Sequence, residues 1–247
     1  MADKKSGGLF DFFKTIIYAV LIALVVRTLA FEPFNIPSKS MLPTLEVGDY
    51  LFVSKYSYGY SRHSLPFSLP LISGRIFSTD PERGDVAVFK TPSDNRTDFI
   101  KRIIGLPGDK IQMKQGRLYI NGGLVRRKRI ENYAETLDNG RSRSVSRYEE
   151  ILPNGRKLPV LEIQLDQGDL DNTGIYTVPE FHYFVMGDNR DNSQDSRVTS
   201  QVGFVPRENL VGRAEILFFS TNGSSVWWNP ISWWTALRGN RVFSLIK

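Results

Sequence analysis

The residue types best suited to chemistry are concentrated in the segment FNIPSKSMLPTL at residues 34–45, where two serines stand between two prolines. Proline fixes the backbone torsion φ, so Pro37 and Pro43 stiffen the chain around Ser38 and Ser40. A stiff segment can hold a hydroxyl and a backbone N–H in fixed directions, which a serine nucleophile with an oxyanion site requires. The alternative is a proline-rich linker that leaves the apolar segment before it.

The chain offers little material for histidine or cysteine chemistry. It has no cysteine, which excludes a thiol nucleophile, a disulfide framework and cysteinyl metal sites, and it has only two histidines. His63 lies in a stretch rich in Ser and Pro and His182 lies in a strand-like run, so we interpret both as structural residues. A Ser-His-Asp triad is therefore poorly supported, and the base must be sought among other side chains.

A lysine in the segment DFIKRIIG at residues 98–105 is the better candidate for the base. If this segment is an extended strand, Phe99, Lys101 and Ile103 share one face, because successive side chains point to opposite sides. Apolar neighbours would desolvate the Lys101 amine and lower its pKa, which is how lysine becomes a neutral general base near pH 7. The alternative is a surface lysine whose amine reaches water.

A third polar cluster, GDNRDNSQDSR at residues 187–197, follows an apolar run and is predicted to be a loop. Its three aspartates offer oxygen ligands of the kind that calcium prefers. Two arginines of the same segment, Arg190 and Arg197, would compete for those carboxylates, and the spacing and final glutamate of an EF-hand are absent. We therefore predict an internally paired network of aspartates and arginines, and no metal site.

The three clusters occur in the order and with the neighbouring sequence of one known family. The chain resembles the bacterial type I signal peptidases, also called leader peptidases, which are membrane-bound serine endopeptidases with a Ser/Lys dyad. The resemblance extends from the N-terminal apolar segment to about Phe219. It rests on five motifs, which are IPSKSMLPTL at 36–45, GDYLFVSK at 48–55, RGDVAVFK at 83–90, FIKRIIGLPGD at 99–109 and GDNRDNSQDSR at 187–197.

The resemblance implies a role for each candidate residue through its position in these motifs. Ser40 matches the nucleophile of the family, Lys101 its general base, and Ser38 the hydroxyl that joins the Ser40 backbone N–H in the oxyanion hole. Ser193 matches the serine that orients the lysine amine. The other matching residues of the last motif are Asp195 and Arg197, as a supporting ion pair, and Asp188 and Asn189, in less defined roles.

The resemblance also implies the substrate, which is an exported preprotein cut after a small residue with a second small residue two positions earlier. Shallow apolar pockets would accept Ala-x-Ala and exclude larger side chains. By alignment, the residues that line these pockets are Phe34, Ile36, Met41, Leu45, Phe99 and Ile100. No cofactor is implied.

The chain departs from the family pattern in two places. Lys39 stands between the two serines, where a residue without a positive charge is commoner, and one N-terminal anchor replaces the pair seen in some members. Alternate side chains of an extended segment point to opposite faces. We therefore expect Lys39 to point away from Ser38 and Ser40, toward water or lipid headgroups.

The apolar segment at residues 9–31 is predicted to be a transmembrane anchor. Its charge-free core from Thr15 to Val26 is short, but at ~1.5 Å per residue the whole segment would reach about 35 Å and cover a hydrocarbon core of about 30 Å. A buried helix or a cleaved signal peptide are alternatives, although Arg27 disfavours cleavage. The basic side chains on its N-terminal side are Lys4, Lys5 and Lys14. The positive-inside rule then places residues 1–8 in the cytoplasm and the rest of the chain outside the bacterial inner membrane.

Beyond this segment the apolar runs are short and separated by turn signals, which is typical of antiparallel β structure. We predict a mainly β, strand-dense catalytic domain at residues 32–219, with insertions at about 57–82 and 131–171 that form loops or a small subdomain. The predicted strands lie at 50–53, 86–89, 99–104, 118–120, 175–178, 183–186 and 214–219. The tail at 220–247 holds all four tryptophans, which favour a membrane interface or pack inside the protein.

The net charge of +6 suits anionic partners, and the anchor favours membrane lipid among them. The densest basic run, at residues 126–129, lacks interleaved aromatic residues, so we predict a solvated hairpin face and no nucleic-acid binding. We expect a monomer.

Two other functions stay open, a self-cleaving Ser/Lys protease of the SOS-repressor type and a non-catalytic, membrane-tethered β-domain. The membrane segment and the absence of a helical DNA-binding head oppose the first, and cleavage of a preprotein would exclude the second.

Overall fold

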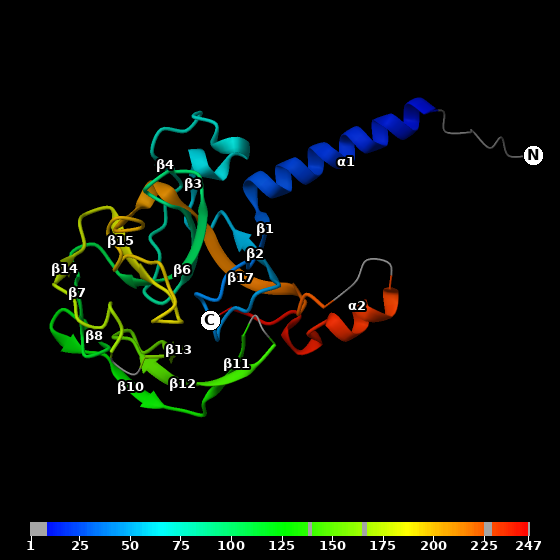
Figure 1. The fold of residues 1–247 in the computed structure, drawn as a ribbon. Helices are drawn as coiled ribbons and strands as arrows, with labels where there is room; N and C mark the ends of the chain where they lie inside the picture. Colours follow the sequence, from blue (N-terminus) through cyan, green and yellow to red (C-terminus); the bar gives the residue numbers. More distant parts are fainter. Residues whose placement is uncertain (1–8, 138–139, 165–166, 225–228, 247) are drawn as a thin grey trace, which may run out of the picture.

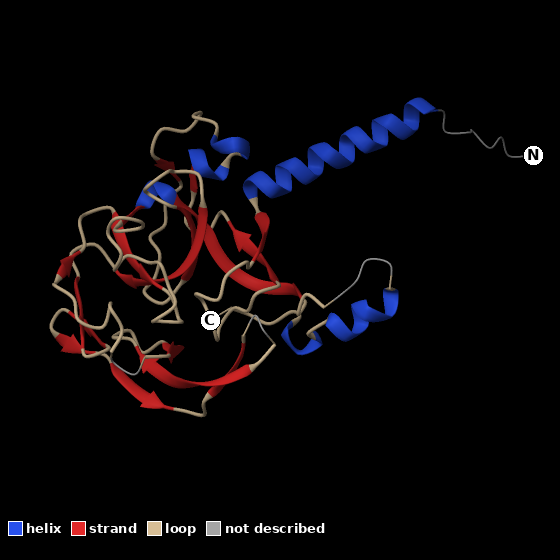
Figure 2. Ribbon diagram, in the orientation of Figure 1, coloured by secondary structure: helices blue, strands red, loops and turns tan. Residues whose placement is uncertain are grey.

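The computed structural model describes residues 9–137, 140–164, 167–224 and 229–246. Most of them form a β-rich body from which one long helix projects (Figures 1 and 2). All strand pairings within the sheets are antiparallel, so the predicted mainly β, antiparallel fold is confirmed. The predictions for residues 1–8, which include Lys4 and Lys5, and for Trp227 and Trp228 concern positions outside the described residues.

The projecting helix is α1 (Leu9–Leu29), and it contains the segment Phe10–Leu29 with a mean hydropathy of 2.0, none of which is buried inside the protein. The helix ends at Leu29 rather than at the predicted Phe31. From Phe31 onward the backbone pairs with a neighbouring strand instead, and Pro33 lacks the N–H that a helix needs. The 21 residues of α1 are close to the roughly 20 that a membrane-spanning helix requires.

The base of α1 is fastened to the β-rich body by short contacts. The Tyr60 hydroxyl donates a hydrogen bond to the Leu29 carbonyl at 2.6 Å, and the Lys55 N–H donates to the Ala30 carbonyl at 2.9 Å. The Lys55 amine also forms an ion pair with Glu32 at 2.9 Å. The helix therefore leaves the body in a defined direction.

The main sheet brings the nucleophile segment and the strand of the candidate base together. Its seven strands, in order across the sheet, are β1 (Phe31–Asn35), β2 (Asp49–Ser54), β17 (Leu210–Ser220), β5 (Val86–Lys90), β6 (Asp98–Gly105), β15 (His182–Met186) and β16 (Val205–Pro206). Val86 and Val88 of β5 pack into one core cluster, whereas Ala87 and Phe89 pack into another. Both faces of this sheet are thus buried, which explains its nearly continuous apolar strands.

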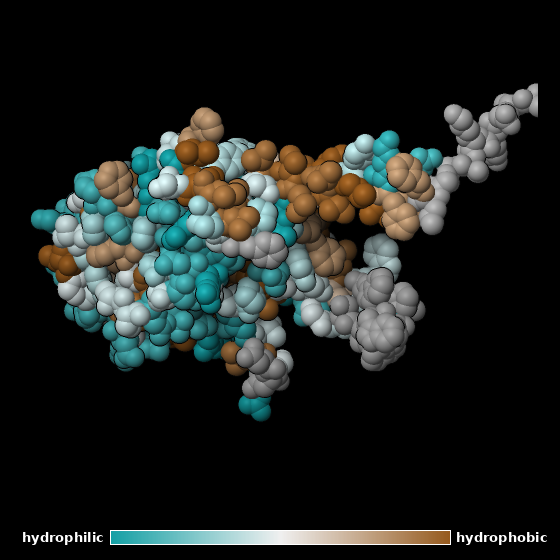
Figure 3. All heavy atoms as spheres, turned by 90° about the horizontal axis from the view of Figure 1, so that it is seen from above, coloured by the Kyte–Doolittle hydropathy of each residue, from teal (hydrophilic) through white to brown (hydrophobic). Residues whose placement is uncertain are grey.

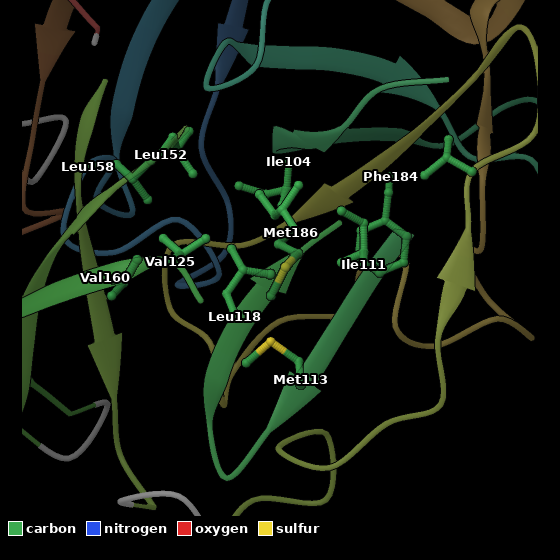
Figure 4. Close-up of a cluster of buried hydrophobic side chains, with 12 residues drawn as sticks. Ile104, Ile111, Met113, Leu118, Val125, Leu152, Leu158, Val160, Phe184 and Met186 are labelled. Atoms are coloured by element: carbon green, nitrogen blue, oxygen red, sulfur yellow. The ribbon is translucent and has the colours of Figure 1, made fainter. Parts of the chain in front are cut away.

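A second sheet packs against the end of the first. Its strands, in order, are β14 (Tyr176–Thr177), β7 (Lys110–Lys114), β8 (Arg117–Ile120) and β9 (Gly123–Leu124). Figure 4 shows the cluster of buried side chains that joins the two sheets, with Ile104, Phe184 and Met186 contributed by the main sheet and Ile111 and Leu118 by the second. Together with the main sheet, the strands at all seven positions predicted from sequence are present.

The insertion at residues 131–171 contains strands and is a small subdomain, not a set of loops. Its sheet is completed by the basic run before it and consists of β10 (Arg126–Arg129), β12 (Ser142–Ile151) and β11 (Tyr133–Thr136), with β13 (Lys157–Glu162) also on β12. The basic run is one strand of this sheet, and it pairs with the end of β12 that carries two glutamates, so that Lys128 faces Glu149 and Arg127 faces Glu150. Opposite charges directly across two antiparallel strands stabilise the pairing.

The other insertion, at residues 57–82, is largely irregular. It holds one short hairpin of β3 (Tyr60–Ser61) and β4 (Arg75–Ile76). Short 3-10 helices lie here and in other connections, as η1 (Arg62–Ser64), η2 (Pro66–Ser68), η3 (Arg207–Asn209) and η4 (Gly239–Arg241).

The C-terminal tail contains α2 (Pro230–Ala236) and then returns to the main sheet. Trp234 of this helix is 79% exposed. The last residues run beside β17, where the Phe243 N–H donates to the Leu217 carbonyl at 2.7 Å. The Arg241 guanidinium donates to the Thr44 carbonyl at 3.0 Å and forms an ion pair with Asp49. The end of the tail is therefore part of the β-rich body, while Trp234 of α2 points outward.

The small subdomain is tied to the polar loop after β15 by a buried ion pair. The Arg190 guanidinium contacts the Glu150 carboxylate of β12 at 2.6 and 3.1 Å, and both side chains are 1% exposed. The Arg190 N–H also donates to the Leu161 carbonyl of β13 at 3.0 Å. This contact positions the polar loop relative to the insertion.

We predict that Glu150→Ala lowers the free energy of unfolding by about 3–5 kcal/mol, because it leaves the buried Arg190 charge without its partner. Glu149→Ala on the same strand is the matched control, since its partner Lys157 is largely exposed, and such surface pairs contribute under about 1 kcal/mol. Urea unfolding of the detergent-solubilised chain measures both. Equal losses in the two variants would contradict the role given to the buried pair.

Candidate active site

The nucleophile candidate lies in the connection between β1 and β2. The Ser38 and Ser40 hydroxyl oxygens are 3.3 Å apart on this segment. The chain forms a turn here rather than the expected extended segment, with the Leu42 N–H donating to the Lys39 carbonyl at 3.2 Å. Met41, which follows the serine, is fully buried in the core beneath and anchors the turn.

The base candidate reaches this turn from β6. The Lys101 Nζ atom lies 2.7 Å from the Ser40 Oγ atom, and the lysine is only 4% exposed. Its amine also donates to the Ile100 carbonyl at 2.9 Å and lies 5.2 Å from the centre of the Phe99 ring. Burial lowers the pKa of Lys101 to about 8, against the opposing effect of the Asp195 and Asp188 carboxylates. The predicted desolvated lysine is thus present, within proton-transfer distance of a serine.

The polar loop after β15 packs against the backbone of the nucleophile. The Asn189 N–H donates to the Ser40 carbonyl at 3.1 Å, and the Asn189 side-chain amide donates to the Lys39 carbonyl at 3.1 Å. Gly187 approaches so closely that a Cβ atom there would collide with the Ser193 Oγ atom and lie 2.5 Å from the Ser40 carbonyl oxygen. Only glycine fits at this position without moving the nucleophile.

Buried arginines hold the carboxylates beneath the site. Asp195 and Arg197 form the predicted ion pair at 2.8 Å, with both side chains fully buried. Burial raises the pKa of Asp195, but the Arg197 guanidinium outweighs it and holds the pKa below its usual value. Asp188 pairs with Arg102 of β6 at 2.6 Å, and not with an arginine of its own loop. The predicted network internal to the loop is therefore only partly correct.

Arg102 and Thr44 are site residues that the sequence analysis missed. The Arg102 guanidinium also donates to the Gly84 carbonyl at 2.7 Å, and the Thr44 hydroxyl donates to Asp188. An arginine within the apolar run FIKRIIG was a usable signal, because a charged residue in a buried strand needs a partner of opposite charge. The identity of that partner required the tertiary structure.

Ser193, which the resemblance assigns to the lysine amine, lines the same cleft. Its hydroxyl is buried and makes no hydrogen bond of ordinary geometry to any described residue. The Lys101 amine bonds to Ser40 and to the Ile100 carbonyl instead. Ser193 and Lys101 thus share the cleft without a hydrogen bond between them, and the orienting role of Ser193 stays a prediction.

A cleft of about 540 Å³ opens over Ser40 and Lys101, and its walls include Phe99 and Ile100 of β6. The other four predicted pocket residues do not line this cleft. Phe34 is half-buried and borders a smaller cavity at the base of α1, whereas Ile36, Met41 and Leu45 are buried in the core below the turn. Ile36, Met41 and Leu45 therefore support the turn from the core and are not part of the exposed wall of the cleft.

Lys39 points away from the serine–lysine pair, as expected, but toward protein rather than water or lipid. Its amine donates to the Thr136 carbonyl of β11 at 3.2 Å and lies 4.0 Å from the Glu135 carboxylate. Glu135 is buried and is also held by Arg143. This lysine therefore connects the nucleophile turn to the small subdomain.

A serine hydroxyl beside a buried lysine amine of lowered pKa, carried by an antiparallel β-domain, has the geometry of a serine hydrolase whose base is lysine. Residues 9–219 match the family profile described as "Signal peptidase, peptidase S26". This chain belongs to that family and is a serine endopeptidase.

Curated relatives match over most of their length. A signal peptidase I of Rickettsia typhi is 43% identical over 235 residues, which cover 90% of this chain and 81% of the relative. A signal peptidase I of Rickettsia canadensis is 42% identical over 254 residues, which cover 93% and 91% of the two chains. The crystal structure of a signal peptidase I from Enterococcus faecalis V583 is 29% identical, covers 55% of this chain and 97% of that chain, and superposes with a TM-score of 0.31.

We predict that Gly187→Ala lowers kcat for peptide-bond cleavage by about 100-fold, because the added Cβ atom collides with the Ser40 carbonyl and the Ser193 side chain and so displaces the site. Gly174→Ala is the matched control, since a Cβ atom there meets nothing within 4 Å, and it should cleave normally. Steady-state kinetics of both purified variants measure the effect. Normal kcat in Gly187→Ala would mean that the loop does not position the nucleophile.

The lowered pKa of Lys101 predicts a pH profile. Only the neutral amine accepts a proton, so kcat/KM should rise tenfold per pH unit up to about pH 8 and level off above it. A free lysine would place this limb near pH ~10.4. Initial rates between pH 5 and about pH 11 test the assignment, and a limb near the free value would show that Lys101 is not desolvated as described.

Proposed function

We propose that this chain is a membrane-anchored endopeptidase that removes signal peptides from exported preproteins, with Ser40 as nucleophile and Lys101 as general base. The observation that carries the proposal is the 2.7 Å approach of the buried Lys101 amine to the Ser40 hydroxyl. Family membership supports the reaction, and the curated relatives bear the name signal peptidase I.

The reaction follows from the charges at these atoms. Neutral Lys101 takes the Ser40 proton as the serine oxygen attacks the carbonyl carbon before the cleaved bond. The resulting oxyanion is held by the Ser38 hydroxyl and the Ser40 N–H, and collapse of the intermediate expels the new amino terminus, which receives the proton from Lys101. Lys101 then activates a water molecule that hydrolyses the acyl-enzyme. Ser193 lines the same cleft, and its hydroxyl would orient the amine after turning toward it from its position in this structure.

The apolar walls of the cleft support a preference for small residues at the cleavage site. Phe99 and Ile100 line it beside Ser40 and Lys101, and Met41 next to the nucleophile is buried in the core. Alanine side chains would fit shallow apolar depressions in such a wall, whereas a larger side chain would keep the carbonyl carbon out of reach of Ser40.

The anchor and the body support one arrangement across the bacterial inner membrane. The N-terminal side of α1 carries Lys4, Lys5 and Lys14, which outnumber Arg27 at its other end, so the positive-inside rule places the N-terminus in the cytoplasm and the catalytic domain outside it. The Arg27 side chain is fastened to Glu32 at 2.6 Å, at the level where the helix meets the body. The complete site is built from a single chain, which supports a monomer.

An aromatic face beside α1 supports contact with lipid. Figure 3 shows apolar side chains along α1 and onto the body where the helix joins it. Phe31 and Tyr56 are 37% and 52% exposed at the base of the helix, with their ring centres 5.6 Å apart, and the Phe52 and Phe218 rings stack at 4.2 Å between β2 and β17. Exposed aromatic residues at this level and Trp234 of α2 would lie in the membrane interface.

The function predicts an order of activity among variants in cleavage of a purified preprotein in detergent. Ser38→Ala should lose about 10²- to 10³-fold in kcat, because one oxyanion donor is removed, whereas Ser40→Ala should show no cleavage. Lys101→Arg should also be inactive, since a guanidinium does not accept the proton. Lys110→Arg, an exposed lysine on β7, is the matched control and should keep full activity.

Cleavage by folded Ser40→Ala or Lys101→Arg would place the nucleophile or base elsewhere. Self-cleavage without cleavage of the preprotein would favour an SOS-repressor-type protease. Absence of cleavage by the wild-type chain under all conditions would favour a non-catalytic membrane-tethered domain.

A further inference from the structure

A second and larger cleft continues from the one that holds Ser40. It has a volume of about 830 Å³ and shares Pro37, Lys39 and Asn192 with the catalytic cleft. One wall is the chain after the nucleophile, and the opposite wall is β11 of the small subdomain with Ala134 exposed on it. No role in the reaction described above uses this space.

The backbone of β11 faces this cleft with an unpaired edge. Within the described residues, β11 pairs with β12 alone. The Leu137 N–H donates to the Arg141 carbonyl. Hydrogen-bonded positions alternate along an antiparallel strand, so Glu135 and Tyr133 also direct their backbone groups to β12. The N–H and carbonyl groups of Ala134 and Thr136 then point to the other edge. The Thr136 carbonyl agrees with this, since it accepts its hydrogen bond from Lys39.

The position of α1 indicates which part of a substrate reaches the second cleft. The catalytic cleft ends at Thr97 and Asp98, and Asp98 also borders the cavity that Arg27 lines at the base of α1. A signal peptide held in the membrane therefore enters from this end. Beyond Ser40 the chain continues toward Lys39 and β11, which lies far from α1 in the fold (Figure 1).

The chemistry of the walls suits an extended polypeptide of variable sequence. Hydrogen-bonding side chains line the cleft at Asn192, Asn222 and Ser224. Its charged side chains form opposite pairs, because Lys39 lies near Glu135 and Arg238 lies 3.4 Å from Glu46. A wall without net charge and an open strand edge recognise main-chain groups rather than particular side chains.

We infer that the first residues of the mature protein, just beyond the cleaved bond, bind in this cleft as an added strand on the free edge of β11. This inference rests on the proposed function and extends it to the side of the substrate that becomes the new N-terminus. Binding there aligns the peptide bond over Ser40 from the far side. It also explains why the insertion packs so closely against the nucleophile turn.

Ala134→Pro tests the inference, because proline removes the one N–H that β11 offers at this position and is tolerated on edge strands. The readout is the ratio of kcat/KM for a preprotein to kcat/KM for a peptide that ends one residue beyond the cleavage site. We expect the ratio to fall about 5-fold, which is the effect of one lost hydrogen bond. The matched control is Thr177→Pro on β14, which is an exposed edge-strand residue remote from both clefts.

A second measurement leaves β11 unchanged. In full-length Ser40→Ala, the β11 amides should exchange hydrogen more slowly with a bound preprotein than with its isolated signal peptide. An unchanged ratio in Ala134→Pro, an equal loss on both substrates, or identical exchange in the two complexes would overturn the inference. Failure of the proposed function is distinguishable, because the wild-type chain would then cleave neither substrate.

Discussion

The burial of one lysine amine is the constraint on which the site depends. An ammonium ion in water holds its proton far above neutral pH, so Lys101 can serve Ser40 only if water is kept from it. Strand β6 achieves this by its position in the main sheet, with Phe99 beside the amine and β5 along its other edge. The exclusion of water from the Lys101 amine therefore depends on the packing of the β-rich body around β6.

The carboxylates near the amine work against this requirement, and the buried arginines limit their effect. Asp188 and Asp195 both raise the pKa of Lys101, and as free charges they would return it toward its ordinary value. Arg102 and Arg197 each bind one of them at hydrogen-bond distance. The same carboxylates hold the turn and the loop around the nucleophile, so pairing them with arginine keeps their structural role while reducing their electrostatic cost to the base.

Short-range patterns predicted much of this fold, because alternation and turn signals depend on neighbouring residues only. The serine and lysine of the site were identified from their residue types and from resemblance to a family. The partners of the buried charges were not predictable in this way, because Arg102 of β6 meets Asp188 and Glu150 of β12 meets Arg190, and both Asp188 and Arg190 lie in the distant loop after β15. Strand β12 was missed because its charged residues do not alternate with apolar ones. They face residues of the neighbouring strands β10 and β13, which the sequence pattern does not reveal.

The return of the C-terminal tail has a consequence for folding. Arg241 contacts the Thr44 carbonyl and Asp49, which flank the segment just after the nucleophile, and Phe243 bonds to β17. The contact between Arg241 and Thr44 joins residues that are 197 positions apart in the sequence. Contacts of such high sequence separation close large loops and form slowly, so this support of the nucleophile turn belongs to the late steps of folding.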